Sequence, residues 1–521
     1  MSRVTSCLSH ACTDLQNAYS KARFVVTVEP ILAVFMLGSN LQYVAIQQLL
    51  YLKTCMFEYN NTDLCSNLSD HKTEEERVQT LTSHWLIILN GGLTVASVLS
   101  TLFLGAWSDR VGRRVCLIIP CVGSIVNAIL LIFSSLNIFM PIWYIVLGSI
   151  LLGMTGGFSL ILSSVFSYMS DLVTVENRTM RFAILESMTF IGSFIGLLTV
   201  GVVIDKAGFV AAFSYYIGCN AVPILYILLW LPESLPTKAT PRTLTSNGID
   251  DDTKELVDEL DGRVASELGN VGNHKTRFCA EFLRVENMKG AVRTVFRKRP
   301  HFQRLQLLLL ILCVTLFQFV GSGEGDTTVL YLKKSPLEFT ASQISYYLGL
   351  KNCVVGATLL IGMPLLRMTS IRDTTIACIG IFGEGSIILL AFSRNLAMVF
   401  SVAVIMAPAA MPAVATRSML SKLVSSSEQG SLFSFVASME SLMVFISSAF
   451  FNWLYPETLH VLEGGFVYLV MAIILIFPFI LMFWIRDLKN VEMEYQIQRQ
   501  EDSNDSAVPV QDYRPHNDST V

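Results

Sequence analysis

The sequence has few charged residues for its length. Only 15% of its 521 residues are Asp, Glu, Lys or Arg, whereas soluble domains carry roughly 25%. With 52% hydrophobic residues and a mean hydropathy of +0.54, this composition excludes an ordinary water-soluble protein and indicates an integral membrane protein. The net charge of −4 is uninformative, because a membrane protein sorts its charges by side.

The sequence also lacks the motifs of several functional classes. We find neither an ATP-binding motif nor a catalytic constellation, so we expect no enzyme, no primary pump, no metal and no cofactor. Residues 1–23 are polar without an apolar core, so we expect no cleavable signal peptide. We expect membrane lipid and a small-molecule substrate as partners, with no nucleic acid and no obligate protein partner.

Long apolar runs dominate the remaining sequence. Runs of about 20 apolar residues can cross the membrane as helices, and we predict twelve of them: 26–50, 84–106, 115–137, 141–169, 182–204, 208–231, 302–325, 342–366, 374–393, 395–416, 430–454 and 463–485. The hydrophilic stretch 232–301 divides them six and six. The sequence therefore predicts an all-α membrane protein with two six-helix bundles, 24–231 and 302–485.

One short turn sets the predicted orientation. Gly105–Arg114 connects the apolar runs 84–104 and 115–136, and its D-R-x-G-R-R pattern has an excess of positive charge. Positive charge favours the cytosolic side. Counting from this turn puts the linker 232–301 and both tails, 1–23 and 486–521, in the cytosol.

The loop 51–83 then lies on the opposite face. It contains two glycosylation sequons, at Asn60 and Asn67, which we expect to be modified. The sequon at Asn177 faces the cytosol in this topology, so we expect it to stay unmodified. Cys55 and Cys65 share the oxidising compartment and can pair as a disulfide, but the sequence leaves the pairing open.

Several segments resemble a known family. Two six-helix halves joined by a long linker suit a transporter whose halves rock around a central site. The Gly105–Arg114 turn is similar to the signature of the major facilitator superfamily. Further stretches resemble solute carrier family 46, the proton-coupled folate transporter family, over about 24–236 and 302–487: Val28-Glu29-Pro30, Leu81 to Trp85, Leu185-Glu186, Arg417 to Val424, Glu428-Gln429-Gly430 and Phe451 to Pro456.

The resemblance implies a conformational latch at the Gly105–Arg114 turn. Asp109, at a helix end, can pair with Arg113 or with the positive N-terminal end of a neighbouring helix, which the family identifies as the eleventh. That helix begins with Ser425 to Glu428, a candidate capping box. The alternative is that the turn only marks topology. The predicted latch residues are Gly105, Asp109, Arg110, Gly112, Arg113, Arg114 and Glu428.

Ionisable side chains inside apolar spans are the candidates for proton and substrate sites, because each costs roughly 2.5–3.5 kcal/mol at the bilayer centre. The resemblance implies that Glu186 is the proton-coupling carboxylate. The alternative is an interfacial glutamate paired with Arg181. We expect Glu324, at the outer end of its span, to be exposed to water.

The predicted substrate-binding residues are Lys351, Arg417, Gln42, Gln48 and Glu440. Lys351 can meet an anionic substrate or form a structural ion pair with Glu384 or Glu440. Arg417 closes the tenth span, where the family carries a functional arginine. For Gln42 and Gln48 the alternative is hydrogen bonding between helices.

The sequence therefore predicts a proton-coupled symporter that moves an organic anion into the cytosol. The family implies a folate-like molecule, a steroid conjugate or a cyclic dinucleotide. Gly321, Ser149 and Gly157 stand where the folate-transporting member carries ionisable residues, which argues against folate itself. An uncoupled facilitator and a transporter-like ligand sensor are the alternatives. The sequence leaves open the plasma membrane or an endolysosomal membrane.

Overall fold

A computed structural model describes residues 27–66, 72–234, 285–299, 302–333, 337, 339, 341–369 and 371–505. Within these ranges every regular element is a helix. The N-terminal tail, the C-terminal tail beyond residue 505, most of the 232–301 linker, and the sequon at Asn67 lie outside the described residues. The first half contains α2 (Glu29–Tyr59), α3 (Thr62–Ser66), α4 (Lys72–Val111), α5 (Arg113–Leu136), α6 (Trp143–Met154), α7 (Gly157–Leu172) and α8 (Arg178–Leu229).

The second half is preceded by a short helix, α11 (Val285–Phe296). Its own helices are α12 (Gln303–Lys333), α13 (Ala341–Ala357), the π-helix η4 (Thr358–Gly362), α14 (Met363–Met368), α15 (Asp373–Gly385), the 3₁₀ helix η5 (Ser386–Phe392), α16 (Leu396–Ile405), α17 (Met411–Lys422), η6 (Ser426–Glu428), α18 (Gln429–Glu457), η7 (Leu462–Gly464) and α19 (Phe466–Asp505).

The helix lengths agree with the predicted all-α membrane fold. Ten helical segments of the described chain are long and apolar enough to cross a membrane. One of them, α8, has 52 residues and is broken by Gly208, whose φ of 78° and ψ of 179° are not helical. It therefore supplies the fifth and sixth spans. The short helices α16 and α17 together occupy the predicted tenth span, which completes twelve crossings.

The fourth span of each half is interrupted. In the first half, α6 ends at Met154 and α7 begins at Gly157, with positive φ at Gly156 and Gly157. In the second half, α16 ends at Ile405 and α17 begins at Met411. We predicted both spans without these breaks, because hydropathy does not register a local break in a helix. Interrupted helices at corresponding positions of two halves are typical of transporter binding sites.

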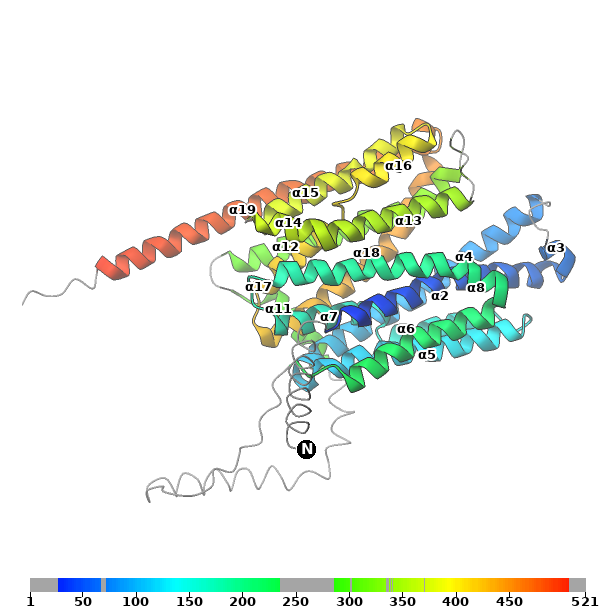
Figure 1. The fold of residues 1–521 in the computed structure, drawn as a ribbon, viewed down its shortest axis with the longest axis horizontal. Helices are drawn as coiled ribbons and strands as arrows, with labels where there is room; N and C mark the ends of the chain where they lie inside the picture. The colour runs from blue at the N-terminus through cyan, green and yellow to red at the C-terminus, as the bar shows by residue number, and fades with distance from the viewer. Residues whose placement is uncertain are drawn as a thin grey trace, which may run out of the picture.

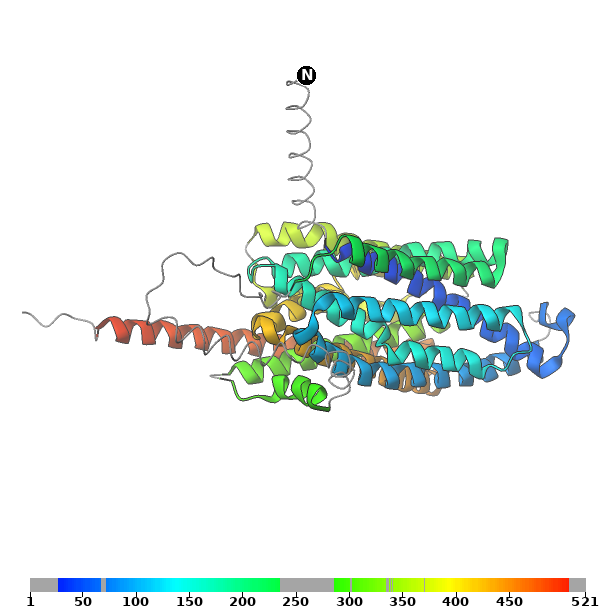
Figure 2. The same cartoon turned by 90° about the horizontal axis from the view of Figure 1, so that it is seen from below.

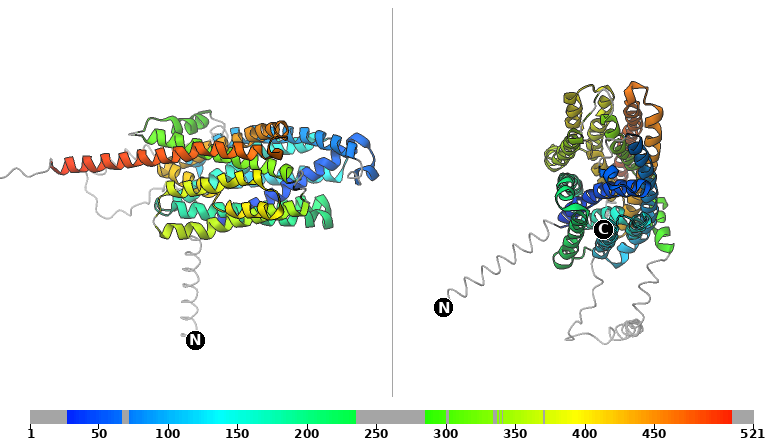
Figure 3. Two further views of the ribbon diagram at one scale, coloured as in Figure 1. Left: turned by 90° about the horizontal axis from the view of Figure 1, so that it is seen from above. Right: turned by 90° about the vertical axis from the view of Figure 1, so that its right-hand side faces the viewer.

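The helices of the two halves lie side by side along a common axis (Figure 1). Viewed end-on, the first-half helices and most of the second-half helices occupy separate parts of the cross-section (Figure 3). The Gly105–Arg114 turn, α11 and α17 lie at one end, which we call the predicted cytosolic face. Helix α3 lies at the other end, and α19 extends beyond the bundle at the predicted cytosolic face (Figures 1 and 2).

Two features extend beyond the predicted spans. Helix α11 forms inside the stretch that we predicted as a linker, and it packs against α4 and α18. Its buried side chains include Ala291 and Val295, so an amphipathic helix covers this part of the bundle. The last helix, α19, continues past residue 485 to Asp505.

Candidate functional site

Three buried ionisable side chains meet between the two halves. Arg417 of α17 donates from Nη1 to Glu186 Oε2 of α8 at 2.8 Å and from Nη2 to Glu440 Oε1 of α18 at 2.7 Å. All three residues are at most 8% exposed. We call these residues the Arg417 cluster. The structure thus brings together three of the predicted site residues.

An aromatic layer supports this cluster. The Arg417 guanidinium carbon lies 4.9 Å from the centre of the Phe166 ring, within the range of a cation–π contact. Phe166 of α7 packs in turn against Phe182 of α8 and Phe433 of α18, with ring centres 4.9 and 5.8 Å away. The sequence analysis missed these rings, because aromatic residues are common in every apolar span.

The charges of the Arg417 cluster do not balance. Two carboxylates and one guanidinium have a formal charge of −1, and a buried net charge is costly. Uptake of one proton by Glu186 or Glu440 makes the cluster neutral. Uptake of a second gives it a charge of +1, which attracts an anion. By this charge count, bound protons favour the binding of an anion at the cluster and do not compete with it.

Glu186 does not form the alternative ion pair with Arg181. Arg181 Nη1 lies 3.2 Å from Glu29 Oε1 of α2, so this arginine joins two helices of the first half. Glu186 is buried and instead accepts a hydrogen bond from Arg417 of the second half. Its bond to Arg417 therefore spans the two halves.

At the predicted cytosolic face, Asp109 of α4 caps the N-terminus of α18. Its Oδ1 accepts the backbone N–H of Gly430, and its Oδ2 accepts the backbone N–H and the hydroxyl of Ser431, all at 2.8 Å. The first backbone N–H groups of a helix have no partner within the helix and favour an anion. Asp109 thus joins the first half to the second.

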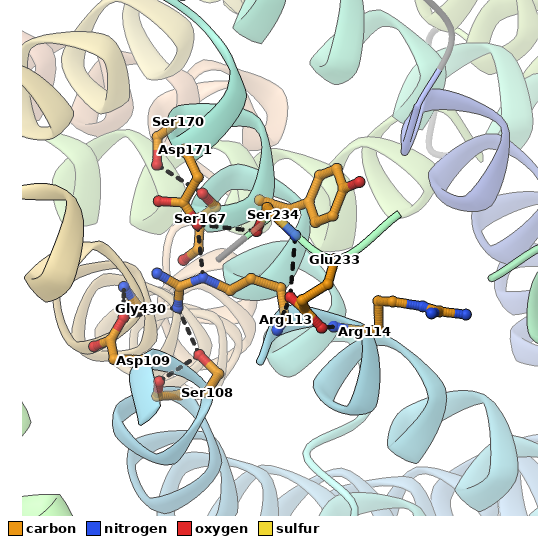
Figure 4. Close-up of polar contacts among 12 residues, drawn as sticks. Ser108, Asp109, Arg113, Arg114, Ser167, Ser170, Asp171, Glu233, Ser234 and Gly430 are labelled. Carbon is orange, nitrogen blue, oxygen red and sulfur yellow. Dashed lines mark hydrogen bonds and ion pairs between the residues drawn. The ribbon is translucent and has the colours of Figure 1, made fainter. Parts of the chain in front are cut away.

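Arg113 holds the Asp109 carboxylate in place (Figure 4). Its Nη1 lies 2.7 Å from Asp109 Oδ1 and its Nε lies 2.9 Å from Asp171 Oδ2 of α7. Nη1 also donates to the Ser108 hydroxyl at 2.7 Å. Arg113 is fully buried, so its charge depends on these two carboxylates.

Glu233 caps the start of α5 in the same network (Figure 4). It accepts the backbone N–H of Arg113 at 2.7 Å and that of Arg114 at 3.4 Å. The Arg114 side chain donates to the carbonyls of Ile227 and Leu228 at 2.6 and 3.1 Å. These contacts tie the turn to the end of α8 within the first half. The sequence analysis missed Glu233, which lies 120 residues away.

Glycines let α4 and α18 approach closely. A methyl group at Gly105 would overlap Ser434 of α18, and one at Gly430 would overlap the Asp109 and Arg113 side chains. Gly112 has a φ of +126°, and a methyl group there would lie 2.6 Å from Glu233 Oε2. The first two glycines serve the contact between the halves, and the third serves the turn.

The predicted capping box at Ser425–Glu428 does not form. Ser425 precedes η6 and its side chain makes no capping hydrogen bond, because α18 begins only at Gln429. Asp109 caps this helix instead. The Glu428 carboxylate pairs with Arg297 and Arg299 at 3.0 and 3.4 Å.

These arginines follow α11, so Glu428 ties the end of the linker to the start of α18. Arg110 is exposed and lines a cavity beside Glu428 and Arg297.

Further polar contacts join the halves at the same face. Arg178 at the start of α8 donates to the carbonyl and hydroxyl of Ser421 of α17, at 2.8 and 3.0 Å. The Thr179 hydroxyl donates to Asp373 Oδ1 of α15 at 2.9 Å, and Lys422 Nζ lies 2.5 Å from Asp373 Oδ2. The halves are therefore closed against each other at the predicted cytosolic face.

Lys351 lies apart from the Arg417 cluster. Its ammonium pairs with Glu324 of α12, and not with Glu384 or Glu440, which were the partners in the alternative to our prediction of substrate binding. Glu324 is only 5% exposed, so the expectation that water surrounds it was wrong. The error arose because α12 continues to Lys333, which places Glu324 well inside the helix.

The remaining predicted residues lie on α2 and in the outer loop. Gln42 is half-buried and Gln48 is exposed, and neither is hydrogen-bonded to the Arg417 cluster in the described structure. Cys55 and Cys65 form a disulfide with Cα atoms 5.9 Å apart. Asn60 is exposed at the end of α2.

The twelve crossings, the interrupted fourth helices and the buried charges between two halves define a multi-pass membrane transporter. The sequence matches the Major Facilitator Superfamily over residues 31–383, which is more than half of the chain. The chain belongs to this superfamily, and it is therefore an integral membrane transporter and not an enzyme.

Curated relatives narrow the resemblance to solute carrier family 46. The chain is 28% identical over 428 residues to the "Proton-coupled folate transporter" of Bos taurus, covering 81% of this chain and 84% of the relative. It is 25% identical over 474 residues to the "Lysosomal proton-coupled steroid conjugate and bile acid symporter SLC46A3" of Gallus gallus, covering 89% and 94%. The predicted resemblance is confirmed.

Solved structures agree on the fold. The human organic anion transporter MFSD10 matches with a TM-score of 0.61 at 15% identity, covering 87% of this chain and 99% of that one. The E. coli fucose:proton symporter FucP matches with a TM-score of 0.56 at 11% identity, covering 88% and 97%. At these identities the likeness shows the fold alone.

Proposed function

We propose that this protein is a proton-coupled symporter that carries an organic anion into the cytosol. The observation that carries the proposal is the Arg417 cluster, in which one buried arginine bridges two carboxylates from different halves. The relatives, which are named for proton-coupled transport of folate or of steroid conjugates and bile acids, support the same class of activity.

In this proposal Glu186 and Glu440 take up protons from the acidic side. While both are ionised, the cluster has a net negative charge and repels an anion. Each bound proton weakens one bond to Arg417 and frees guanidinium N–H groups for a carboxylate, sulfonate or phosphate of the substrate. Proton and anion therefore bind favourably only together. Such linkage is the basis of coupling.

Transport also requires the halves to separate at the cytosolic face. We propose that the contacts of Asp109 with the start of α18 hold the outward-facing state, with Gly105, Gly112, Arg110, Arg113, Arg114 and Glu428 supporting them. Loss of the Glu186–Arg417 bond would remove one further connection between the halves. The proton site would thereby favour opening of the latch.

The test is uptake into cells at external pH 5.5 and 7.4, using a folate, a sterol conjugate and a cyclic dinucleotide as probes. A difference of one pH unit supplies about 1.4 kcal/mol per proton, roughly a tenfold accumulation. We expect concentrative uptake of one probe at pH 5.5 that Glu186→Gln and Glu440→Gln abolish. Glu457→Gln is the matched control, because Glu457 is exposed on the same helix as Glu440.

Uptake that is equal at both pH values and insensitive to Glu186→Gln would identify an uncoupled facilitator. Binding of a probe to the purified protein without any flux would identify a ligand sensor. Either result contradicts the proposed symport.

A further inference from the structure

The second half contains another buried charged cluster, which the proposed coupling site does not use. Glu324 of α12 is paired with Lys351 of α13, and Glu384 of α15 is the third ionisable residue. Glu324 and Glu384 are 5% and 6% exposed. The charges of both Glu324 and Lys351 act on Glu384. We call these three residues the Lys351 cluster.

Glu384 faces the same turn of α12 that carries Glu324. A methyl group added at Gly321 would lie 3.9 Å from Glu384 Oε1, and Gly321 precedes Glu324 by three residues, so both lie on one face of the helix. Because Gly321 has no side chain, no side chain from this position fills the space beside the Glu384 carboxyl group.

The Glu384 carboxyl group is poorly satisfied as an anion. Its Oε2 is buried and has no hydrogen-bond partner among the described residues. A buried ionised carboxylate that lacks partners for an oxygen loses the free energy of hydration of that oxygen. A protonated carboxyl group has no charge to solvate, and it is the form that this environment favours.

Among the described residues, Lys351 is the positive charge that acts on Glu384. Tyr347 of α13 and Tyr468 of α19 are buried and interact electrostatically with Glu324. Two prolines pack against α15: Pro408, in the link before α17, lies beside Gly383, and Pro412, at the start of α17, lies beside Gly380. The charged groups of α17 are engaged elsewhere, since Arg417 binds Glu186 and Glu440 and Lys422 binds Asp373.

We propose that Glu324, Lys351 and Glu384 form a second proton-binding site, with Glu384 as the group that holds the proton. Two carboxylates and one ammonium have a formal charge of −1, so one proton makes the cluster neutral. The same count holds for the Arg417 cluster. The protein would then bind two protons at separate sites, one within the second half and one between the halves.

The second site is not fully enclosed by protein. Gly321 is exposed, and the side chain of Lys351 is 21% exposed. Along α12, Glu324 lies in the part of the helix further from the predicted cytosolic face, because α12 begins at that face. A proton from the opposite side can therefore enter here while the cytosolic contacts stay closed. This inference extends the proposed symport, but its test does not depend on a substrate.

The test is infrared spectroscopy of the full-length protein in lipid nanodiscs, titrated between pH 5 and pH 9. Protonated carboxyl groups absorb separately from carboxylates, so their number can be followed. We expect Glu384→Gln to remove the absorption of one buried carboxylic acid. Glu457→Gln, which changes an exposed carboxylate, should leave that absorption unchanged. A Glu384→Gln spectrum identical to that of the unmodified protein over the whole titration would overturn the proposal.

A second variant keeps the test independent of the folding of Glu384→Gln. Lys351→Met leaves Glu324 and Glu384 without a cation, so we expect one additional carboxylic acid at pH 7. No increase would contradict the shared site. Glu186→Gln reports separately on the Arg417 cluster. If Glu186→Gln removes a carboxylic-acid absorption and Glu384→Gln removes none, the second site is refuted and the symport proposal still stands.

Discussion

Arg417 Nη1 lies 2.8 Å from Glu186 Oε2, although 231 residues separate the two positions and they belong to different halves of the chain. This hydrogen bond can exist only while the two halves lie close together around Arg417. Because breaking one side of a buried ion pair costs about 3–5 kcal/mol, its loss must be compensated by protonation or by a substrate anion.

We expect Arg417→Lys to reduce uptake at pH 5.5 at least tenfold. Lysine is a point charge that cannot bridge two carboxylates in the planar geometry of a guanidinium, and it loses the contact with Phe166. Surface expression and uptake should be measured together. Arg486→Lys is the control, because Arg486 also stacks on a phenylalanine, Phe483, but is exposed. Unchanged uptake by Arg417→Lys would contradict a role for the bridge.

We expect Asp109→Asn to weaken the closed cytosolic face. Asparagine loses the ion pair with Arg113 and can accept fewer of the N–H groups that open α18. Loss of a helix cap costs about 0.5–2 kcal/mol, so the population that is open to the cytosol should rise roughly tenfold. The readout is labelling of Ser434→Cys by an impermeant maleimide from the cytosolic side. The background replaces by serine the cysteines of the predicted cytosolic segments and those that are not fully buried, namely Cys7, Cys12, Cys279, Cys353 and Cys378.

The matched control for that experiment is Asp205→Asn, which changes an exposed aspartate in the link between the fifth and sixth spans. It should label as slowly as the parent protein. Equal labelling rates in Asp109→Asn and Asp205→Asn would show that the Asp109 cap does not hold the face closed.

We expect Gly105→Ala to disrupt the same contact by steric overlap. The added methyl group would meet the Ser434 side chain of α18, which forces the two helices apart. Gly201→Ala is the control, because no atom lies within 4 Å of a methyl group at that position. Cytosolic labelling and uptake should both change for Gly105→Ala alone. A Gly105→Ala protein that transports and labels like Gly201→Ala would exclude close packing at this glycine.

The sequence predicted the helices better than it predicted their partners. Hydropathy located every span, because about 20 apolar residues are needed to cross the bilayer. It did not locate the breaks at 155–156 and 406–410, because the residues there are as apolar or small as their neighbours. The signals that could have indicated them were the pair Gly156-Gly157 in the fourth span and Pro408 in the tenth, because proline interrupts a helix.

In the candidate site, too, the sequence predicted the residues better than their partners. Glu186 and Glu440 were selected as ionisable residues in apolar spans, and the family resemblance supplied the roles of Glu186 and of Arg417 at the end of the tenth span. These three residues are neighbours in the structure. The partner of Lys351 was missed, because a helix end read from hydropathy placed Glu324 in water. The Ser425 capping box was wrong for another reason: a cap supplied by Asp109 from a different helix leaves no local sequence pattern.

The last prediction concerns orientation, on which the proposed direction of transport depends. We expect glycosidase treatment to lower the apparent mass, and we expect Asn60→Gln and Asn67→Gln each to remove one glycan. Asn60 is exposed at the end of α2, and α3, which follows it, lies away from the predicted cytosolic face (Figure 1). Asn177→Gln, at the exposed start of α8 on the other face, should have no effect and serves as the matched control. Sugar on Asn177 together with none on Asn60 or Asn67 would invert the topology, and the Asp109 contacts would then close the outer side of the membrane.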